Sequence, residues 1–134
     1  MVKRILLAYD GSESAGRAFD QAVDLAARYA AELTVLAVAR PPEYGSEVET
    51  EAIIENSRKH FQHVLKPLKE RAPNARFEVA VGHPAVQITA YAEAHSMDFI
   101  VMGHRGKTLF ERWLIGSVTK KVTSYAPCSV LVVR

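Results

Sequence analysis

Three glycines, Gly103, Gly106 and Gly116, punctuate the stretch of this chain that is best suited to binding chemistry. The stretch follows the short apolar run 99–102 and leads into a helix-like segment that begins at Ser117. Glycine permits positive φ angles and the close approach of a ligand to the backbone. Hydroxyl groups and free amides at the start of a helix can hold an anion. The pattern therefore predicts a phosphate site built by a strand, a glycine loop and a helix N-terminus.

The excess positive charge of the chain lies in the same stretch. Between Gly103 and Lys121, five basic residues stand against the single acidic residue Glu111, a net charge of +4, whereas the whole chain carries +2. The five are Arg105, Lys107, Arg112, Lys120 and Lys121. Such a cluster attracts anions, although lysines and arginines scattered on a solvated loop would give the same count. The glycine spacing favours the phosphate site.

Two common nucleotide motifs are absent. The dinucleotide fingerprint G-x-G-x-x-G would follow the first strand, where the chain instead has the residues 10–14, Asp-Gly-Ser-Glu-Ser. The segment 106–108, Gly-Lys-Thr, is similar to the end of a Walker A loop, but the glycine required five residues earlier is Val101. These differences argue against a dinucleotide-binding domain and a P-loop NTPase.

Composition indicates an ordinary globular domain. The chain of 134 residues is 49% hydrophobic and 24% charged, and Cys128, its one cysteine, excludes an internal disulfide and is expected to be a buried, inert thiol. The chain has no run of about 18 apolar residues, so we expect no membrane span. The first residues lack the features of a signal peptide. The net charge is too small to indicate nucleic-acid binding. We therefore expect a cytoplasmic protein that binds neither nucleic acid nor membrane.

Short apolar runs predict five strands, and amphipathic segments between them predict four helices. The predicted strands are residues 2–8, 33–39, 76–81, 99–102 and 129–133. The predicted helices start after Ser12 or Ser14, Glu47, His83 and Gly116. Pro67 should kink or end the second helix, whose boundary we place between Ala72 and Asn74. Strands that alternate with helices imply one open α/β domain, residues 1–134, with a parallel sheet and helices on both faces.

Asp10 is the candidate metal ligand. Ligands of open α/β sheets bind beyond the carboxyl ends of the strands, and Asp10 ends the first strand as Gly103 ends the fourth. If these strands are neighbours, both loops line one crevice. A carboxylate beside a polyphosphate suits Mg²⁺. The alternative for Asp10 is an Asx turn or a helix cap.

The spacing of the glycines resembles the motif G-x2-G-x9-G-[S/T] of the universal stress protein family. Gly103, Gly106, Gly116 and Ser117 match all its fixed positions. The resemblance covers the whole chain, and its other landmarks are residues 3–8, Asp10-Gly11-Ser12, Gly82-His83-Pro84, residues 98–103 and residues 127–133. It implies a Rossmann-like sheet, similar to the adenine nucleotide alpha hydrolases, with the strand order 3-2-1-4-5.

The resemblance also implies ATP binding in the branch that carries this motif, with ADP or AMP left open as the resident ligand. By position, Ala8, Tyr9 and Asp10 would lie beside ribose, phosphate or Mg²⁺; Val38 would touch adenine; Met102 and Gly103 would border base and ribose. The phosphates and ribose would be held by Arg105, Gly106, Gly116, Ser117, Val118 and Thr119, with His104 beside them. Tyr9 departs from the smaller residue common in the family, and its ring should pack in the core or crowd the ribose.

Three functions fit these observations. The leading one is an ATP-binding regulatory or stress-response protein, in which nucleotide orders the loop from Gly103 to Gly116 and changes the surface offered to a protein partner. The second is a slow ATPase or phosphotransferase that uses His104 or Asp10. The third is a dimerisation module that does not depend on nucleotide.

The last strand and one histidine pair complete the expectations. Family members commonly form homodimers through the last strand, and the apolar run 130–133 could supply such an edge. His60 and His63 share a helix face but lack carboxylate or cysteine partners, so we expect surface residues and not a metal site.

Overall fold

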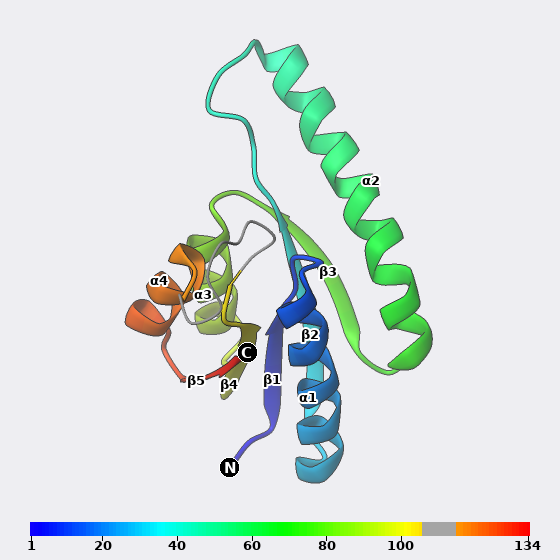
Figure 1. Ribbon diagram of the computed structural model, residues 1–134, viewed down its shortest axis with the longest axis vertical. Helices are drawn as coiled ribbons and strands as arrows, with labels where there is room; N and C mark the ends of the chain where they lie inside the picture. Colours follow the sequence, from blue (N-terminus) through cyan, green and yellow to red (C-terminus); the bar gives the residue numbers. More distant parts are fainter. Residues whose placement is uncertain (106–114) are drawn as a thin grey trace.

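Strands and helices alternate along the chain in the computed structural model, which describes residues 1–105 and 115–134 (Figure 1). The strands are β1 (Arg4–Ala8), β2 (Glu32–Ala39), β3 (Arg76–Val81), β4 (Phe99–Gly103) and β5 (Ser129–Val133). The helices are α1 (Glu13–Tyr29), α2 (Glu47–Arg71), α3 (Pro84–Ala94) and α4 (Ser117–Tyr125). The predicted order of elements is confirmed.

The strands form one parallel sheet in the order β3-β2-β1-β4-β5, as the family resemblance implied. Strand β1 lies at its centre, where Ala8 is level with Leu36 of β2 and with Met102 of β4. The chain goes from β1 outward to β2 and β3, then returns to the other side of β1 for β4. The direction of winding therefore reverses between β1 and β4, which is where open α/β sheets bind ligands.

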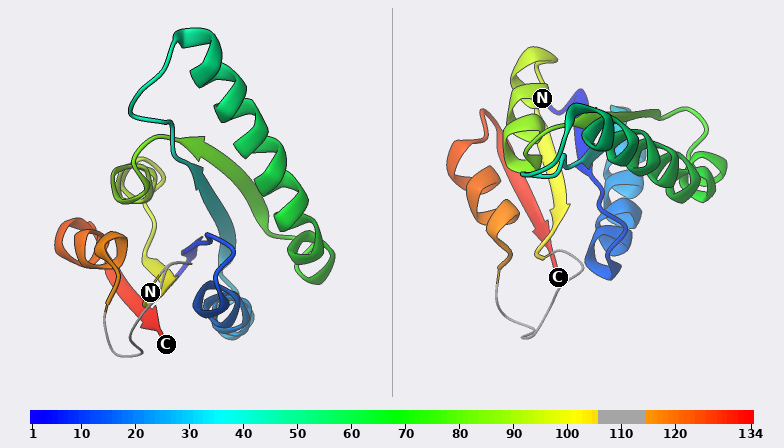
Figure 2. Two further views of the ribbon diagram at one scale, coloured as in Figure 1. Left: turned by 45° about the horizontal axis from the view of Figure 1, so that its top comes forward. Right: turned by 90° about the horizontal axis from the view of Figure 1, so that it is seen from above.

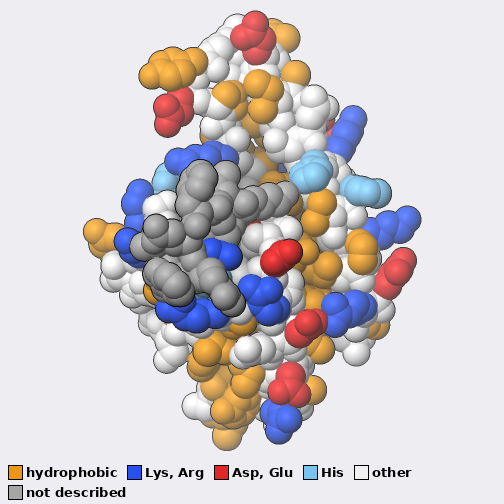
Figure 3. All heavy atoms as spheres, in the orientation of Figure 1, with side chains coloured by type: hydrophobic (Ala, Val, Ile, Leu, Met, Phe, Trp, Pro, Cys, Tyr) orange, Lys and Arg blue, Asp and Glu red, His pale blue; other side chains and the backbone are white. Residues whose placement is uncertain are grey.

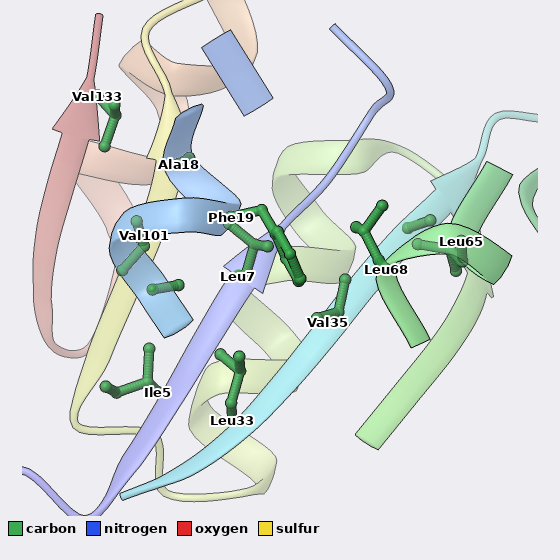
Figure 4. Packing of buried hydrophobic residues seen from close by; sticks show 12 residues of the cluster. Ile5, Leu7, Ala18, Phe19, Leu33, Val35, Leu65, Leu68, Val101 and Val133 are labelled. Atoms are coloured by element: carbon green, nitrogen blue, oxygen red, sulfur yellow. The ribbon is translucent and has the colours of Figure 1, made fainter. Parts of the chain in front are cut away.

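Each face of the sheet is covered by two helices, α1 and α2 on one side and α3 and α4 on the other (Figure 2). Strand side chains alternate between the faces, so Ile5 and Leu7 pack toward α1 and α2, whereas Leu6 and Ala8 pack toward α3 and α4. Figure 4 shows the first of these cores, with Phe19 of α1 directed toward the sheet. Burial on both faces explains why the strands read as continuous apolar runs.

Helix α2 is anchored at one end only. It starts with a capping box, in which Ser46 Oγ accepts from Glu49 N and Glu49 Oε2 accepts from Ser46 N, both at 3.2 Å. Its buried residues are Leu65 and Leu68, near its C-terminal end. The N-terminal half stands beyond the carboxyl edge of the sheet (Figure 1).

Pro67 does not end α2. The helix continues to Arg71, in agreement with the predicted boundary between Ala72 and Asn74. The proline removes one helix hydrogen bond, but Leu65 and Leu68 on either side of it are both buried against the sheet. Packing on both sides of the proline holds the helical path. Even this 25-residue helix is too polar to cross a membrane, and no other described helix is long and apolar enough to do so.

Cys128 is half-buried, and burial, together with the nearby Asp98 carboxylate, raises the pKa of its thiol. The thiol is therefore protonated and unreactive near neutral pH, as expected, although it is less buried than predicted. Asp98 itself accepts from the backbone amides of Lys3 and Arg4, at 2.8 and 2.9 Å, and these bonds lower its pKa. They join the starts of β1 and β4.

Candidate functional site

The ends of β1 and β4 and the start of α4 meet at the carboxyl edge of the sheet. Strands β1 and β4 are hydrogen-bonded neighbours, as predicted. His104, directly after β4, donates its backbone N–H to Val133 O at 2.7 Å and accepts from Gly116 N at 2.8 Å. The backbone of one residue therefore connects the ends of β4 and β5 to the residue that precedes α4.

Two serines hold the loop after β4 against α1. Ser14 Oγ donates to Arg105 O at 2.9 Å, and Ser12 Oγ lies 3.4 Å from the same carbonyl. Ser12 is also the N-cap of α1 and accepts from Ala15 N at 3.2 Å. Of the two caps considered from the sequence, Ser12 is the correct one, and Ser14 instead fixes the backbone at Arg105.

Gly103 is required by close packing and not by a positive φ angle. A Cβ at this position would collide with Ser14 Oγ and would lie 2.8 Å from Ala15 N and 2.9 Å from Ser14 C. Among the described glycines, positive φ occurs at Gly11, Gly45 and Gly82 and not at Gly103. Gly103 is needed because the first turn of α1 leaves no space for a side chain.

The N-terminus of α4 has the form expected of an anion site. Gly116 is the N-cap, with extended backbone (φ −64°, ψ 156°), no capping side chain, and no acidic residue in the first turn. The helix ladder begins with Lys120 N–H donating to Gly116 O at 3.0 Å. The helix itself therefore does not use the amides of Ser117, Val118 and Thr119. Ser117 is exposed, so its hydroxyl and these amides form a set of donors at the positive end of a helix.

Thr119 has a structural contact that the sequence did not reveal. Its side chain is 2% exposed, and Oγ1 donates to Gly103 O at 2.9 Å. The hydroxyl that was predicted to hold phosphate or ribose thus satisfies the carbonyl that ends β4. Its remaining capacity is as an acceptor, which does not suit a phosphate oxygen.

We expect Thr119→Val to lower the free energy of unfolding by about 1–3 kcal/mol, because the Gly103 carbonyl would lose its hydrogen bond in a buried setting. Urea denaturation without nucleotide measures this effect. Thr123→Val on the same helix is the control; its hydroxyl donates to Lys120 O at an exposed position, and we expect a change within about 0.5 kcal/mol. Equal stability of the two variants would show that Thr119 does not support the fold.

His104 is buried. Its side chain is 2% exposed, and Nδ1 lies 3.3 Å from Val133 O. Because a carbonyl only accepts, Nδ1 carries the proton in this contact. The ring is therefore a hydrogen-bond donor to the end of β5.

Asp10 forms the turn that was the alternative to a metal site. Its side chain is exposed, and Oδ1 accepts from Ser12 N at 2.9 Å, an Asx turn that leads into α1. The turn uses one of two carboxylate oxygens, so Asp10 can still offer the other to a cation. No three histidine, cysteine, aspartate or glutamate side chains among the described residues cluster to hold a metal. A cation here would need phosphate oxygens and water.

The other predicted contacts differ in exposure. Ala8 and Met102 are buried in the core beneath α3 and α4, so only their backbone could face a ligand. Val118 packs against the same core. The half-buried ring of Tyr9 packs on the opposite core, and burial followed by the Asp10 charge raises its pKa. Gly106 and the loop to residue 114 lie outside the described residues.

A cavity opens beside this edge, between the ends of β1 and β2 and the N-terminal half of α2. It has a volume of about 710 Å³ and is lined by Asp10, Val38, Arg40, Ile53, Asn56, Ser57, His60 and Phe61. Val38 and Asp10 were predicted; the wall from α2 was missed. The one signal in the sequence is that Ile53, Asn56, Ser57 and His60 recur at three- and four-residue spacing, which places them on one helix face. His60 and His63 are exposed, as predicted.

An open parallel sheet of this order, with a glycine-capped helix at its carboxyl edge, defines a Rossmann-like α/β protein. Residues 1–134 match the model of the universal stress protein family. The Staphylococcus haemolyticus protein SH1215 is 37% identical over 139 residues, which cover 98% of this chain and 84% of the relative. Universal stress protein UspA from Lactobacillus plantarum is similar in structure, with a TM-score of 0.87 and 33% identity over 98% of this chain and 97% of that chain. The chain belongs to the universal stress protein family.

Two more distant structures were solved with nucleotides. One is a universal stress protein in complex with cAMP, with a TM-score of 0.66 and 22% identity over 98% of this chain and 97% of that chain. The other is the protein from Archaeoglobus fulgidus in complex with dAMP, with a TM-score of 0.64 and 19% identity over the full length of both chains. At these identities the likeness establishes a shared fold, and the ligands are those of the two relatives.

Proposed function

We propose that this protein binds ATP at the carboxyl edge of its sheet and acts as a nucleotide-dependent regulator in a stress response. The observation that carries the proposal is the start of α4, where Gly116 leaves the helix amides without a capping side chain. A phosphate accepts from such amides and is attracted by the helix dipole. The cAMP and dAMP complexes of two distant relatives support nucleotide binding by this fold.

Different residues would contact different parts of the nucleotide. Ser117 and the amides of α4 would hold phosphate, with Arg105 and Gly106 beside them. The backbone of Met102 and Gly103 would border base and ribose, and Val38 would face adenine. Asp10 fits Mg²⁺ through its free carboxylate oxygen. When bound, Mg²⁺ would neutralise phosphate charge.

Ligand-dependent order of the loop between Gly103 and Gly116 remains the proposed switch. A homodimer through β5 also remains a proposal; β5 lies at one edge of the sheet, and three of its four valine and leucine residues are partly exposed. An enzymatic role gains no specific support, because the His104 ring is bonded to a backbone carbonyl.

The direct test is to purify the protein, denature it and identify the released small molecules by mass spectrometry. We expect ATP, ADP or AMP in proportion to protein. If none is released, titration of the purified protein with Mg-ATP in a calorimeter decides the matter. Absence of binding at millimolar Mg-ATP would refute the proposal.

We expect Gly116→Val to weaken ATP binding on the order of a hundredfold, because the side chain would displace phosphate from charge-assisted bonds to the α4 amides. The backbone at Gly116 is extended and accepts any residue, so the fold should persist. Calorimetric titration measures the affinity. Gly16→Val is the matched control, since a Cβ at Gly16 would meet nothing within 4 Å. Equal affinity in both variants would remove the site assignment.

A further inference from the structure

Helix α2 carries a row of exposed residues on the side that is turned away from the sheet. Leu65 and Leu68 define the side that packs on the sheet. Away from it, residues at alternating spacings of four and three follow one line along the helix. These residues are all exposed, and none of them lines the cavity: Val48, Ala52, Glu55, Lys59, Gln62 and Lys66. We call them the outer row; it spans about 27 Å of helix.

The charges of α2 are divided between its two halves. The half from Glu47 to Asn56 has four glutamates and no basic residue, a net charge of −4, whereas the half from Ser57 to Arg71 has five basic residues and one glutamate, a net charge of +4. In Figure 3 the lobe that carries the start of α2 shows acidic and hydrophobic side chains, and histidine and basic side chains appear further down.

The helix dipole explains only part of this division. Acidic residues stabilise the first turn of a helix and basic residues the last turn, but the effect falls off beyond those turns. Glu55 and Lys59 lie near the middle of α2, and neither forms an ion pair with another described residue. The two central charges of the outer row are therefore available to a partner.

A second α2 that runs antiparallel to the first is complementary to the outer row. In a twofold symmetric contact, residue i of one chain meets residue j of the other, and j meets i. With the axis level with Ser57, Glu55 of each copy faces Lys59 of the second copy, so the charge pair forms twice. Val48, which is 76% exposed, then lies level with Lys66 of the second copy, whose aliphatic stem can cover it.

We infer that the outer row is a self-association surface, through which a second copy of this chain binds α2 against α2 in antiparallel orientation. A partner of one charge would match one half of the helix and repel the other, whereas a second copy matches both. The surface is separate from the proposed dimer contact, because α2 packs on β2 and β3 and the edge strand β3 lies opposite β5. The contact would also support the half of α2 that is not anchored on the sheet.

Sedimentation equilibrium without nucleotide tests the inference. The surface is one helix wide and mostly polar, so we expect a dissociation constant on the order of 100 μM at low ionic strength, and weaker association in high salt. Glu55→Lys should weaken association about tenfold, because both central pairs become pairs of lysines, and Lys59→Glu should do the same. A homodimer through β5 would set the starting mass at two chains, which α2 pairing would then double.

The decisive sample is an equimolar mixture of Glu55→Lys and Lys59→Glu. We expect it to recover the wild-type affinity, because the two lysines of one chain would face the two glutamates of the other. Within each chain, like charges four residues apart remain, so a change in helix stability could not produce the recovery. Asp24→Lys mixed with Arg28→Glu is the matched control; it alters an exposed pair of the same spacing on α1, and mixing should change nothing.

Two results would overturn the inference. One is a mixture that associates no better than either variant alone. The other is wild-type protein whose mass shows no increase with concentration up to about 1 mM at low ionic strength. Because nucleotide is absent from these measurements, they are independent of the proposed function, and a failure of ATP binding would not account for either result.

Discussion

Gly103→Ala is expected to destabilise the protein by about 2–3 kcal/mol, at the upper end of the usual cost of overpacking. The new Cβ would collide with Ser14 Oγ and lie 2.8 Å from Ala15 N and 2.9 Å from Ser14 C. Two of these atoms belong to the backbone of the first turn of α1 and cannot rotate away. Relief would require α1 to move from β4, which would disturb the bond from Ser14 Oγ to Arg105 O.

Urea denaturation of the protein without nucleotide measures this cost. The matched control is Gly16→Ala, four residues into the same helix, where a Cβ meets nothing within 4 Å and alanine should raise helix stability by roughly 0.5–1 kcal/mol. If the two variants are equally stable, the packing explanation is wrong. Loss of ATP affinity alone, with stability unchanged, would return Gly103 to a role in binding only.

The layered fold could be predicted from the local hydrophobic pattern. A strand that is buried on both faces has a continuous apolar run, and a helix that covers the sheet has one apolar stripe. Periodicity predicted the order of elements from β1 to β5. It did not specify the strand order, which came from the family resemblance and is confirmed. Local reasoning also left open whether Pro67 ends α2 there, since the burial of Leu65 and Leu68 on either side of it depends on the sheet.

The sequence indicated those parts of the candidate site that backbone groups form, but not the parts that depend on contacts between distant side chains. Glycine at an N-cap before an unshielded helix start is visible in the motif itself. The contacts of Ser14 with the Arg105 carbonyl and of Thr119 with the Gly103 carbonyl join segments far apart in sequence. The α2 wall could not be inferred either, because a helix face gives no sign of whether it meets the sheet or a cavity.

Phe19→Ala should have the largest effect on stability, about 3–5 kcal/mol. Phe19 is 1% exposed and lies among the residues of α1, α2 and the sheet that form the first core (Figure 4). Its removal would lose the transfer free energy of the ring and leave a cavity that a parallel sheet and two helices cannot close. Tyr29→Ala is the control, because this aromatic residue of the same helix is 53% exposed and should cost far less.

The same substitution should also affect α2, and through it the cavity. The Arg71 guanidinium lies 4.9 Å from the centroid of the Phe19 ring and pairs with Asp20 at 2.6 Å, so the end of α2 rests on this part of α1. The Arg71–Asp20 pair is exposed and contributes little alone. Loss of the ring should therefore loosen the anchored end of the helix whose earlier turns line the cavity. We expect the backbone amides of α2 to exchange hydrogen faster in Phe19→Ala under conditions where the protein is still folded. An unchanged exchange rate would show that Leu65 and Leu68 hold α2 without Phe19.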